Sequence, residues 1–218
     1  MGSTRMSKKR IVITGLGMVS PLGNTVTDNW NNLLAGVSGI GPVTRFDASN
    51  LACQIAGEVK DFDITQYIPA KEARRMDVFI HYGIAAAFQA IEDAGLDNIE
   101  GLDKTRVGVN IGAGIGGLPS IEATGADVIA GGIRKINPFF IPGSLINLIA
   151  GHVTIMKGYQ GPSYGIVSAC TTGAHCIGDA ARMIAYGDAD IMIAGGAEGA
   201  ICTLGMGGFA AMKALSTR

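Results

Sequence analysis

The stretch SYGIVSACTTGAHCIGDAARMIAYGDADIMIAGG, residues 163–196, decides the fold because it combines a strand, a helix and a second strand. The apolar run YGIVSA predicts a buried strand, and DIMIAGGA predicts another. Between them, apolar residues at helical spacing and the stop at Gly187 predict a helix over about residues 171–187. Cys170 stands where the first strand meets this helix.

The rest of the chain continues the alternation of strands and helices. Further strands are expected within residues 10–15, 54–59 and 105–112. Helices are expected over residues 25–36, 70–96, part of 119–132 and an apolar, buried stretch from 143 to 158. Apolar strands alternating with helices indicate a mainly parallel sheet covered on both faces, and therefore an α/β fold.

Composition excludes several classes of function. The 17 Lys and Arg nearly balance the 18 Asp and Glu, which argues against nucleic-acid or anionic-membrane binding. No apolar run is long enough to predict a membrane span. Residues 1–9 form a polar leader without the apolar region of a signal sequence, and MGSTR before a second Met indicates an addition from cloning. We expect a cytoplasmic protein.

Cys170 is the first candidate for chemistry. At a helix N-terminus, unpaired N–H groups and the helix dipole favour an anion such as a thiolate. The backbone N–H of Cys170 could also donate to a developing oxyanion. The alternative is a small, inert core residue, since free Cys is often buried. Cys53, Cys176 and Cys202 lack such a position and are predicted to be core residues.

The three histidines offer no obvious partner for the thiol. His175 lies on another face of the predicted helix from Cys170, so its ring is poorly placed to take the thiol proton. His81 and His152 fall within predicted helices, and a structural role is the simpler interpretation for all three. No spacing of His, Cys and Asp indicates a metal site, and no cofactor is expected.

Two Gly-rich turns weakly suggest a dinucleotide site. GAGIGG (112–117) matches the pattern GxGxxG after a strand, and GLGMVS (15–20) nearly does. Neither has the acidic residue expected about 20 positions further on, and no helix is expected to open at GLPS (117–120). A nicotinamide-dependent oxidoreductase is therefore a remote alternative.

Several segments together resemble the beta-ketoacyl-[acyl-carrier-protein] synthases, most closely the type II elongating enzymes. They are IVITGLGMVSPLGN, RMDVFIHYGIAAAFQAIEDAGL, GVNIGAGIGGLPSIE, RKINPFFIPGSLINLIAGHVTIMKGYQGPS, SACTTGAHCIGDAARMIAYGDADIMIAGGAE and MKALSTR. The resemblance covers about residues 10–218, with the Cys stretch its most specific part. It implies a thiolase-like fold, of which residues 10–218 would be the N-terminal half of a duplicated, layered α/β/α architecture.

The resemblance also implies an activity and partners. Members of this family are homodimeric acyltransferases of fatty acid biosynthesis that act with acyl carrier protein. An acyl group moves to the active-site thiol, and decarboxylation of malonyl-carrier protein then gives a carbanion that attacks the thioester. Covalent catalysis of this kind divides one difficult step into two.

Matching the family's motifs position by position assigns roles to eight residues of this chain. Cys170 matches the nucleophile, and Ile115 matches the residue that gates the acyl pocket. Phe140 and Phe209 match pocket-lining positions, Phe140 reaching across the dimer. The basic residues that match the docking site for the acidic carrier protein are Lys71, Arg74, Arg75 and Lys213.

The family's two catalytic His, its supporting Lys and the loop that supplies a second oxyanion donor belong to the half that this chain does not resemble. None of the three His here matches those positions, so the resemblance implies that Cys170 alone could be acylated but could not complete the condensation. The end at ALSTR suggests a truncated or divided protein. A non-catalytic half-domain for dimerisation or carrier-protein binding is the alternative.

Overall fold

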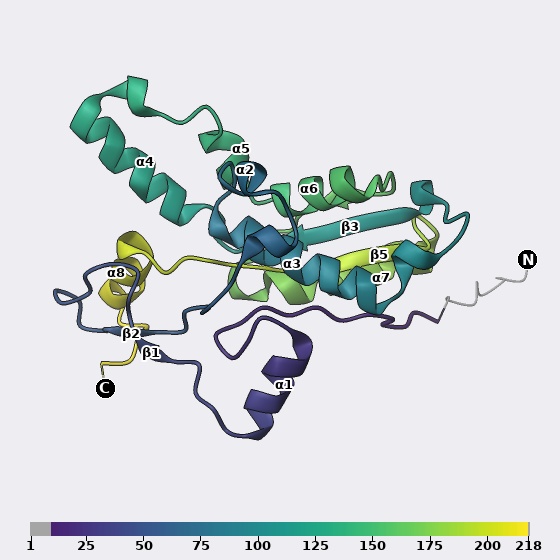
Figure 1. The fold of residues 1–218 in the computed structure, drawn as a ribbon, viewed down its shortest axis with the longest axis horizontal. Helices are drawn as coiled ribbons and strands as arrows, with labels where there is room; N and C mark the ends of the chain where they lie inside the picture. Colours follow the sequence, from purple (N-terminus) through teal and green to yellow (C-terminus); the bar gives the residue numbers. More distant parts are fainter. Residues whose placement is uncertain (1–9, 218) are drawn as a thin grey trace, which may run out of the picture.

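A three-stranded parallel sheet with the order β4-β3-β5 lies at the centre of the structure (Figure 1). β3 (Val107–Gly112) pairs with β4 (Ser163–Tyr164) on one side and with β5 (Ile191–Gly196) on the other. All residues of β3 are buried, as expected of a central parallel strand. The structure is a computed structural model and describes residues 10–217.

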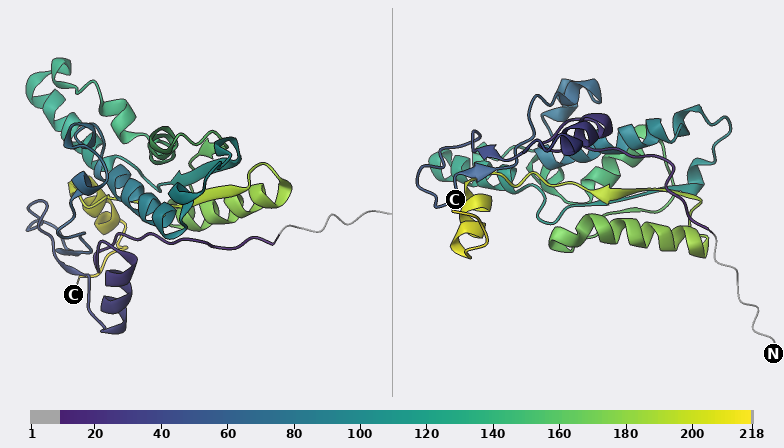
Figure 2. Two further views of the ribbon diagram at one scale, coloured as in Figure 1. Left: turned by 45° about the vertical axis from the view of Figure 1, so that its right-hand side comes forward. Right: turned by 90° about the horizontal axis from the view of Figure 1, so that it is seen from below.

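Helices cover both faces of this sheet. α3 (Val78–Asp93) and α6 (Leu148–Lys157) pack together against one face, and α7 (Thr172–Tyr186) packs against β3 and β5 on the other. Figure 2 shows α7 and α3 on opposite sides of β5. The predicted α/β class and the parallel sheet are confirmed.

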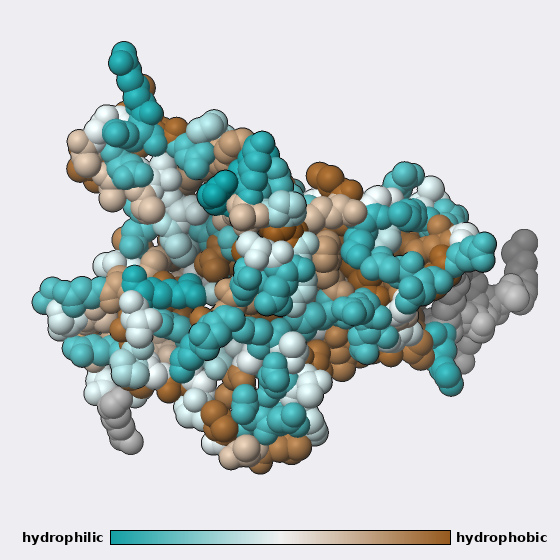
Figure 3. Space-filling view, in the orientation of Figure 1, coloured by the Kyte–Doolittle hydropathy of each residue, from teal (hydrophilic) through white to brown (hydrophobic). Residues whose placement is uncertain are grey.

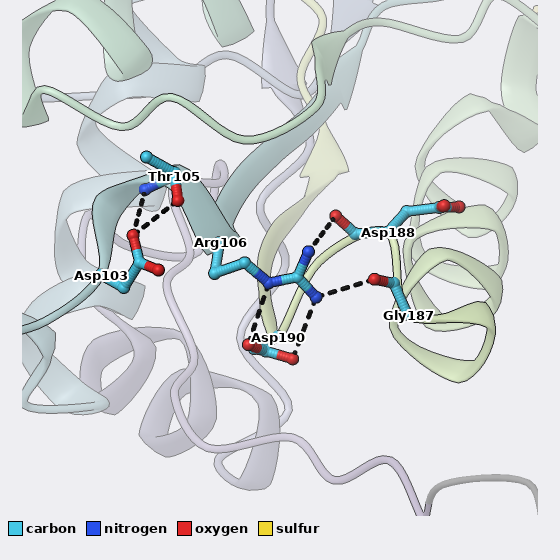
Figure 4. A network of polar contacts seen from close by, with 6 residues as sticks. All are labelled: Asp103, Thr105, Arg106, Gly187, Asp188 and Asp190. Carbon is cyan, nitrogen blue, oxygen red and sulfur yellow. Dashed lines mark hydrogen bonds and ion pairs between the residues drawn. The ribbon is translucent and has the colours of Figure 1, made fainter.

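One arginine ties the start of β3 to the turn between α7 and β5 (Figure 4). The Arg106 guanidinium donates to both carboxylate oxygens of Asp190, at 3.1 and 3.2 Å. It also donates to the backbone carbonyls of Gly187 at 2.7 Å and Asp188 at 3.1 Å. These contacts join the chain immediately before both strands, so they favour the register in which Val107 lies beside Ile191.

The β1 and β2 strands form a separate antiparallel pair. The remaining elements, these two strands included, surround the layered core. They are α1 (Val26–Leu34), β1 (Gly41–Pro42), β2 (Ile55–Ala56), η1 (Ile64–Gln66), α2 (Ala70–Ala73), η2 (Leu96–Asn98), η3 (Lys104–Arg106), α4 (Leu118–Gly131), η4 (Ile133–Lys135), α5 (Phe140–Ser144), η5 (Ala169–Thr171) and α8 (Thr203–Ala211). Within residues 10–217, every helix is too short or too polar to cross a bilayer.

The prediction of one helix over residues 70–96 is wrong. The chain forms α2, leaves the helical conformation, and starts again at α3. Asp77 lies between them with extended backbone angles, and its carboxylate accepts from the N–H of Phe79. Its own N–H donates to the carbonyl of Gly143 at 3.0 Å, so a contact with a distant segment interrupts the helix.

The helices after the Gly-rich turn also differ from the prediction. The expected helix over 143–158 is divided into α5 and α6, with an extended residue, Leu145, after α5. The segment is only partly buried, because Ile155 in α6 is 76% exposed. Conversely, the segment expected to be helical in part forms a complete helix, α4, that opens at Leu118.

Two strands are shorter than predicted and one is absent. Only Ile55–Ala56 of residues 54–59 and only Ser163–Tyr164 near residues 164–169 are paired. Residues 10–15 form no strand and lie along α3 instead, where the N–H of Leu16 donates to Asp93. A Cβ added to Gly15 would lie 2.2 Å from the carbonyl oxygen of Ala90, so this close approach requires glycine.

Part of the surface is strongly apolar. On α1, Trp30, Leu33 and Leu34 are more than half exposed, and Figure 3 shows apolar residues at the edge of this lobe beside hydrophilic ones. Large apolar side chains are rarely left uncovered in such groups on monomeric soluble proteins. The exposed apolar face of α1 is therefore a candidate for contact with other protein segments.

Candidate functional site

The predicted nucleophile lies at a sharp turn between β4 and α7. Cys170 is in η5, the single turn immediately before α7, and its side chain is exposed. The other three cysteines are buried, as predicted. Burial raises the pKa values of the Cys176 and Cys202 thiols, which keeps them protonated and unreactive.

The turn has an unusual backbone. Ala169, the residue before Cys170, has a φ of 52°, in the left-handed region that non-glycine residues seldom adopt. The N-cap residue of α7, Thr171, makes no side-chain hydrogen bond to the first turn of the helix. The N–H groups of Thr171 and Thr172 donate instead to the carbonyls of Ser168 and Ala169, and the dipole of α7 still favours an anion at this end of the helix. Position and exposure both favour the reactive interpretation of Cys170.

A Gly-rich loop packs against this turn. A Cβ on Gly114 would lie 3.0 Å from the carbonyl oxygen of Ala169, and one on Gly112 would lie 2.0 Å from that of Ile166. Ile115, the predicted gate residue, follows directly and is 38% exposed. The loop after β3 and the Cys170 turn therefore lie side by side, which sequence spacing alone did not reveal.

Glu198 holds this loop and was missed by the sequence analysis. Its carboxylate accepts from the N–H of Ile115 at 2.7 Å and from that of Gly116 at 3.1 Å. The available signal was an acidic residue directly after a strand that neighbours a Gly-rich turn. Consecutive N–H groups of such a turn bind anions well.

This contact bears on the dinucleotide alternative. A helix does open after GAGIGG, contrary to expectation, so the local pattern of strand, Gly-rich loop and helix is present. However, the N–H groups that would bind a pyrophosphate are engaged by Glu198 and, at Gly117, by the carbonyl of Ser144. The other Gly-rich turn follows no strand, and its Leu16 and Met18 N–H groups donate to α3 side chains.

The histidines make separate contacts. The Nδ1 atom of His175 lies 2.7 Å from the hydroxyl of Ser168, so its ring bonds to the residue two positions before Cys170. His81 Nε2 bonds to the carbonyl of Ala73, and His152 is half-buried in α6. Burial lowers the pKa values of both His81 and His152. Among the described residues, no cluster of His, Cys, Asp and Glu could hold a metal ion.

The structure separates the predicted acyl-pocket residues. Phe209 lines a cavity of about 600 Å³ together with Met18, Tyr82 and Met206, but Cys170 does not line it. Phe140 begins α5 and is half-buried. α5 meets the loop after β3 through the bond from Gly117 to Ser144.

The predicted basic docking residues fall into two places. Lys71 and Arg74 are exposed on and after α2. The Arg75 side chain contacts other residues of this chain. Its guanidinium pairs with the Glu72 carboxylate at 2.9 Å and lies 4.4 Å from the centre of the Phe139 ring. Lys213 follows α8, which lies apart from α2 in Figures 1 and 2. These residues do not form one patch within this chain.

Comparison with known proteins decides the family. The family model "Beta-ketoacyl synthase, N-terminal domain" matches residues 8–218. The chain belongs to this family. It is 56% identical over 213 residues to the 3-oxoacyl-[acyl-carrier-protein] synthase 2 of Vibrio harveyi, covering 98% of this chain and 51% of that protein. The chain thus spans about half the length of the curated relatives it matches.

Solved structures agree with this assignment and with the thiolase-like fold. A beta-ketoacyl synthase from Burkholderia phymatum superposes with a TM-score of 0.84 at 28% identity, over 96% of this chain and 52% of that one. A type II PKS acyl-carrier protein in complex with its ketosynthase gives a TM-score of 0.80 at 27% identity, covering 94% and 55%. The chain therefore corresponds to the N-terminal half of the ketosynthase architecture.

Proposed function

We propose that residues 10–218 are the nucleophile-bearing half of a fatty acid elongating condensing enzyme. The observation that carries the proposal is the exposed Cys170 at the N-terminus of α7, beside the Gly-rich loop. The names of the curated relatives support the substrate class, since they are 3-oxoacyl-[acyl-carrier-protein] synthases.

In the proposed reaction, the Cys170 thiolate attacks the thioester carbonyl of acyl-carrier protein. A new C–S bond forms, and the carrier thiolate leaves. Malonyl-carrier protein then loses CO₂, and the resulting carbanion attacks the Cys170 thioester. The carbon–carbon bond forms, the Cys170 thiolate is released, and 3-oxoacyl-carrier protein is the product. The backbone N–H of Cys170 would donate to the oxyanion in each attack on a carbonyl.

The partners and pocket residues are part of the same proposal. A similar solved ketosynthase structure contains an acyl-carrier protein, which supports a carrier protein as the partner. Lys71, Arg74, Arg75 and Lys213 are the proposed docking residues. Ile115, Phe140 and Phe209 would contact the acyl chain. Homodimerisation is supported by Ile129 and Ile133, 90% and 77% exposed on the α4–η4 arm, which projects from the body in Figure 1. The proposed location is the cytoplasm, where four free thiols stay reduced.

Intact-mass measurement after incubation with fatty acyl-carrier protein tests the proposal. We expect one acyl adduct on the wild-type protein and none on Cys170→Ala, with the buried Cys176 and Cys202 as internal controls. Absence of an adduct on the wild type, or an equal adduct on Cys170→Ala, would leave a non-catalytic half-domain as the better interpretation.

A further inference from the structure

Ser168 is tied to the start of α7 by each of its polar groups. Its N–H donates to the Thr172 hydroxyl at 2.9 Å, and its carbonyl accepts from the N–H of Thr171 at 3.2 Å. Its own hydroxyl bonds to Nδ1 of His175 at 2.7 Å. The Thr172 side chain is buried, so the first of these anchors has little freedom to move.

These bonds hold a backbone that would otherwise relax. Ala169 follows Ser168 and precedes Cys170, and its φ of 52° is costly for a residue with a Cβ. Such a conformation persists only where its surroundings fix it. Gly114 leaves only a narrow space on the other side of Ala169. The position of the Cys170 thiol therefore depends on how firmly Ser168 is held.

We propose that His175 is a positioning residue that fixes the Cys170 turn through the Ser168 hydroxyl. His175 is in the second turn of α7, so its ring links the helix back to the residue that leads into the turn. This role rests on the proposed function of Cys170 as the nucleophile. This role explains why His175, only five positions after Cys170, bonds to Ser168 and not to the thiol.

The test compares the rates at which acyl-carrier protein acylates, and iodoacetamide alkylates, Cys170 in the full-length gene product. His175→Ala and Ser168→Ala should each slow both reactions about three- to tenfold, the effect of one lost hydrogen bond. The double variant should be no slower than the slower single variant, because both changes remove the same bond.

Conservative variants separate positioning from general stability. The amide nitrogen of Asn stands at the same point of its side chain as Nδ1 of His, so His175→Asn should recover much of the rate. His175→Gln, with its amide further out, should not, and Ser168→Thr should retain the wild-type rate. Arg182→Ala, at an exposed site two turns further along α7, is the matched control and should react like the wild type.

The pH profile distinguishes a positioning residue from a base. The ratio of the wild-type to the His175→Ala rate should stay constant from about pH 6 to about pH 8, where an ordinary imidazole titrates. A ratio that follows this titration would overturn the positioning role, as would equal rates in the two proteins. If the wild type itself takes no acyl group while iodoacetamide still distinguishes His175→Ala, the proposed function fails and the positioning role stands.

Discussion

Residues 10–17 and residues 106–114 have the same sequence pattern, yet they lie in different environments. RIVITGLG and RVGVNIGAG each have an Arg, an apolar run rich in β-branched residues and a Gly-x-Gly turn. The second forms β3, whose residues are all buried between two parallel neighbours. The first forms no strand, and its Val12 and Ile13 are 59% and 77% exposed.

The difference teaches that an apolar run becomes a strand only when it has partners on its edges. β3 has β4 and β5 as partners, whereas residues 10–17 have the side of α3 and an apolar groove of about 560 Å³ toward α7 and β5. Both Gly-x-Gly turns make close backbone contacts. Glycine packing thus does not distinguish the two regions, but hydrogen bonding between strands does.

The largest expected effect comes from Gly112→Ala in β3. The added Cβ would lie 2.0 Å from the Ile166 carbonyl, and this backbone is held between strands, so we expect a loss of about 3 kcal/mol of folding free energy. Gly17→Ala should cost less, about 1 to 2 kcal/mol, because its segment can move away from α3. Urea denaturation of the 218-residue chain measures both.

Gly125→Ala in α4 is the control for these two variants, since its added Cβ meets no atom within 4 Å. It should leave the stability unchanged or raise it slightly, as Ala is the better helix former. Equal losses for Gly112→Ala and Gly17→Ala would mean that residues 10–17 are held as firmly as β3.

A matched pair of valines gives the next effect. Val109 is fully buried in β3, so Val109→Ala should cost about 2 kcal/mol through lost apolar burial and the cavity left behind. Val12→Ala, at an exposed side chain, should change the folding free energy by less than about 0.5 kcal/mol. A comparable loss at Val12 would contradict its exposure and show that another segment or a second copy covers it.

The same contrast explains what the sequence could predict about the fold. β3, β5 and α7 have strong apolar patterns and lie in the centre, where the pattern and the environment agree. The long helix expected over residues 70–96 was wrong because Asp77 bonds to Gly143, a contact that no local pattern contains. The strand expected at residues 10–15 was wrong because a β-branched run does not carry information about its neighbours.

The site divides in a similar way. The place of Cys170 between a strand and a helix was predicted, but the sequence left an exposed thiol and an inert core residue as alternatives, and the structure shows the thiol exposed. The contact of Glu198 with Ile115 and Gly116 could not be predicted, because it joins residues more than 80 positions apart. The bond between His175 and Ser168 was also missed, since helix spacing was considered only in relation to the thiol.

Acidification should weaken the helical layer of α3 and α6 that covers β3. Burial lowers the folded-state pKa values of His81 and His152, so their contribution is fully present above the unfolded value of about 6.5. It is lost as the pH falls below about 6.5 toward the folded values. Urea denaturation should therefore give a lower folding free energy at about pH 5.5 than at about pH 7.5.

The double variant His81→Gln/His152→Gln is the comparison for this effect, because Gln does not titrate. Its stability should change less over the same pH range than that of the wild type. An equal change in both proteins would assign the acid sensitivity to other groups.

The smallest expected effect is local and concerns how residues 10–17 are held. Asp93→Ala removes the acceptor of the Leu16 N–H, which lies 2.8 Å from the carboxylate, while the bond from Met18 to Gln89 remains. Loss of one exposed hydrogen bond should speed amide exchange at Leu16 about fivefold. Exchange in β3 should not change, because its bonds open only with the core.

Amide exchange measured by NMR resolves these outcomes residue by residue. If residues 10–17 were paired as a strand on the free edge of β5, their amides would be protected by backbone carbonyls. Asp93→Ala would then leave their exchange unchanged, and exchange at Ile11 and Ile13 would be as slow as in β3. Faster exchange at Leu16 alone would show that side chains of α3 hold residues 10–17. The two regions would then differ because β3 has strand partners and residues 10–17 have none.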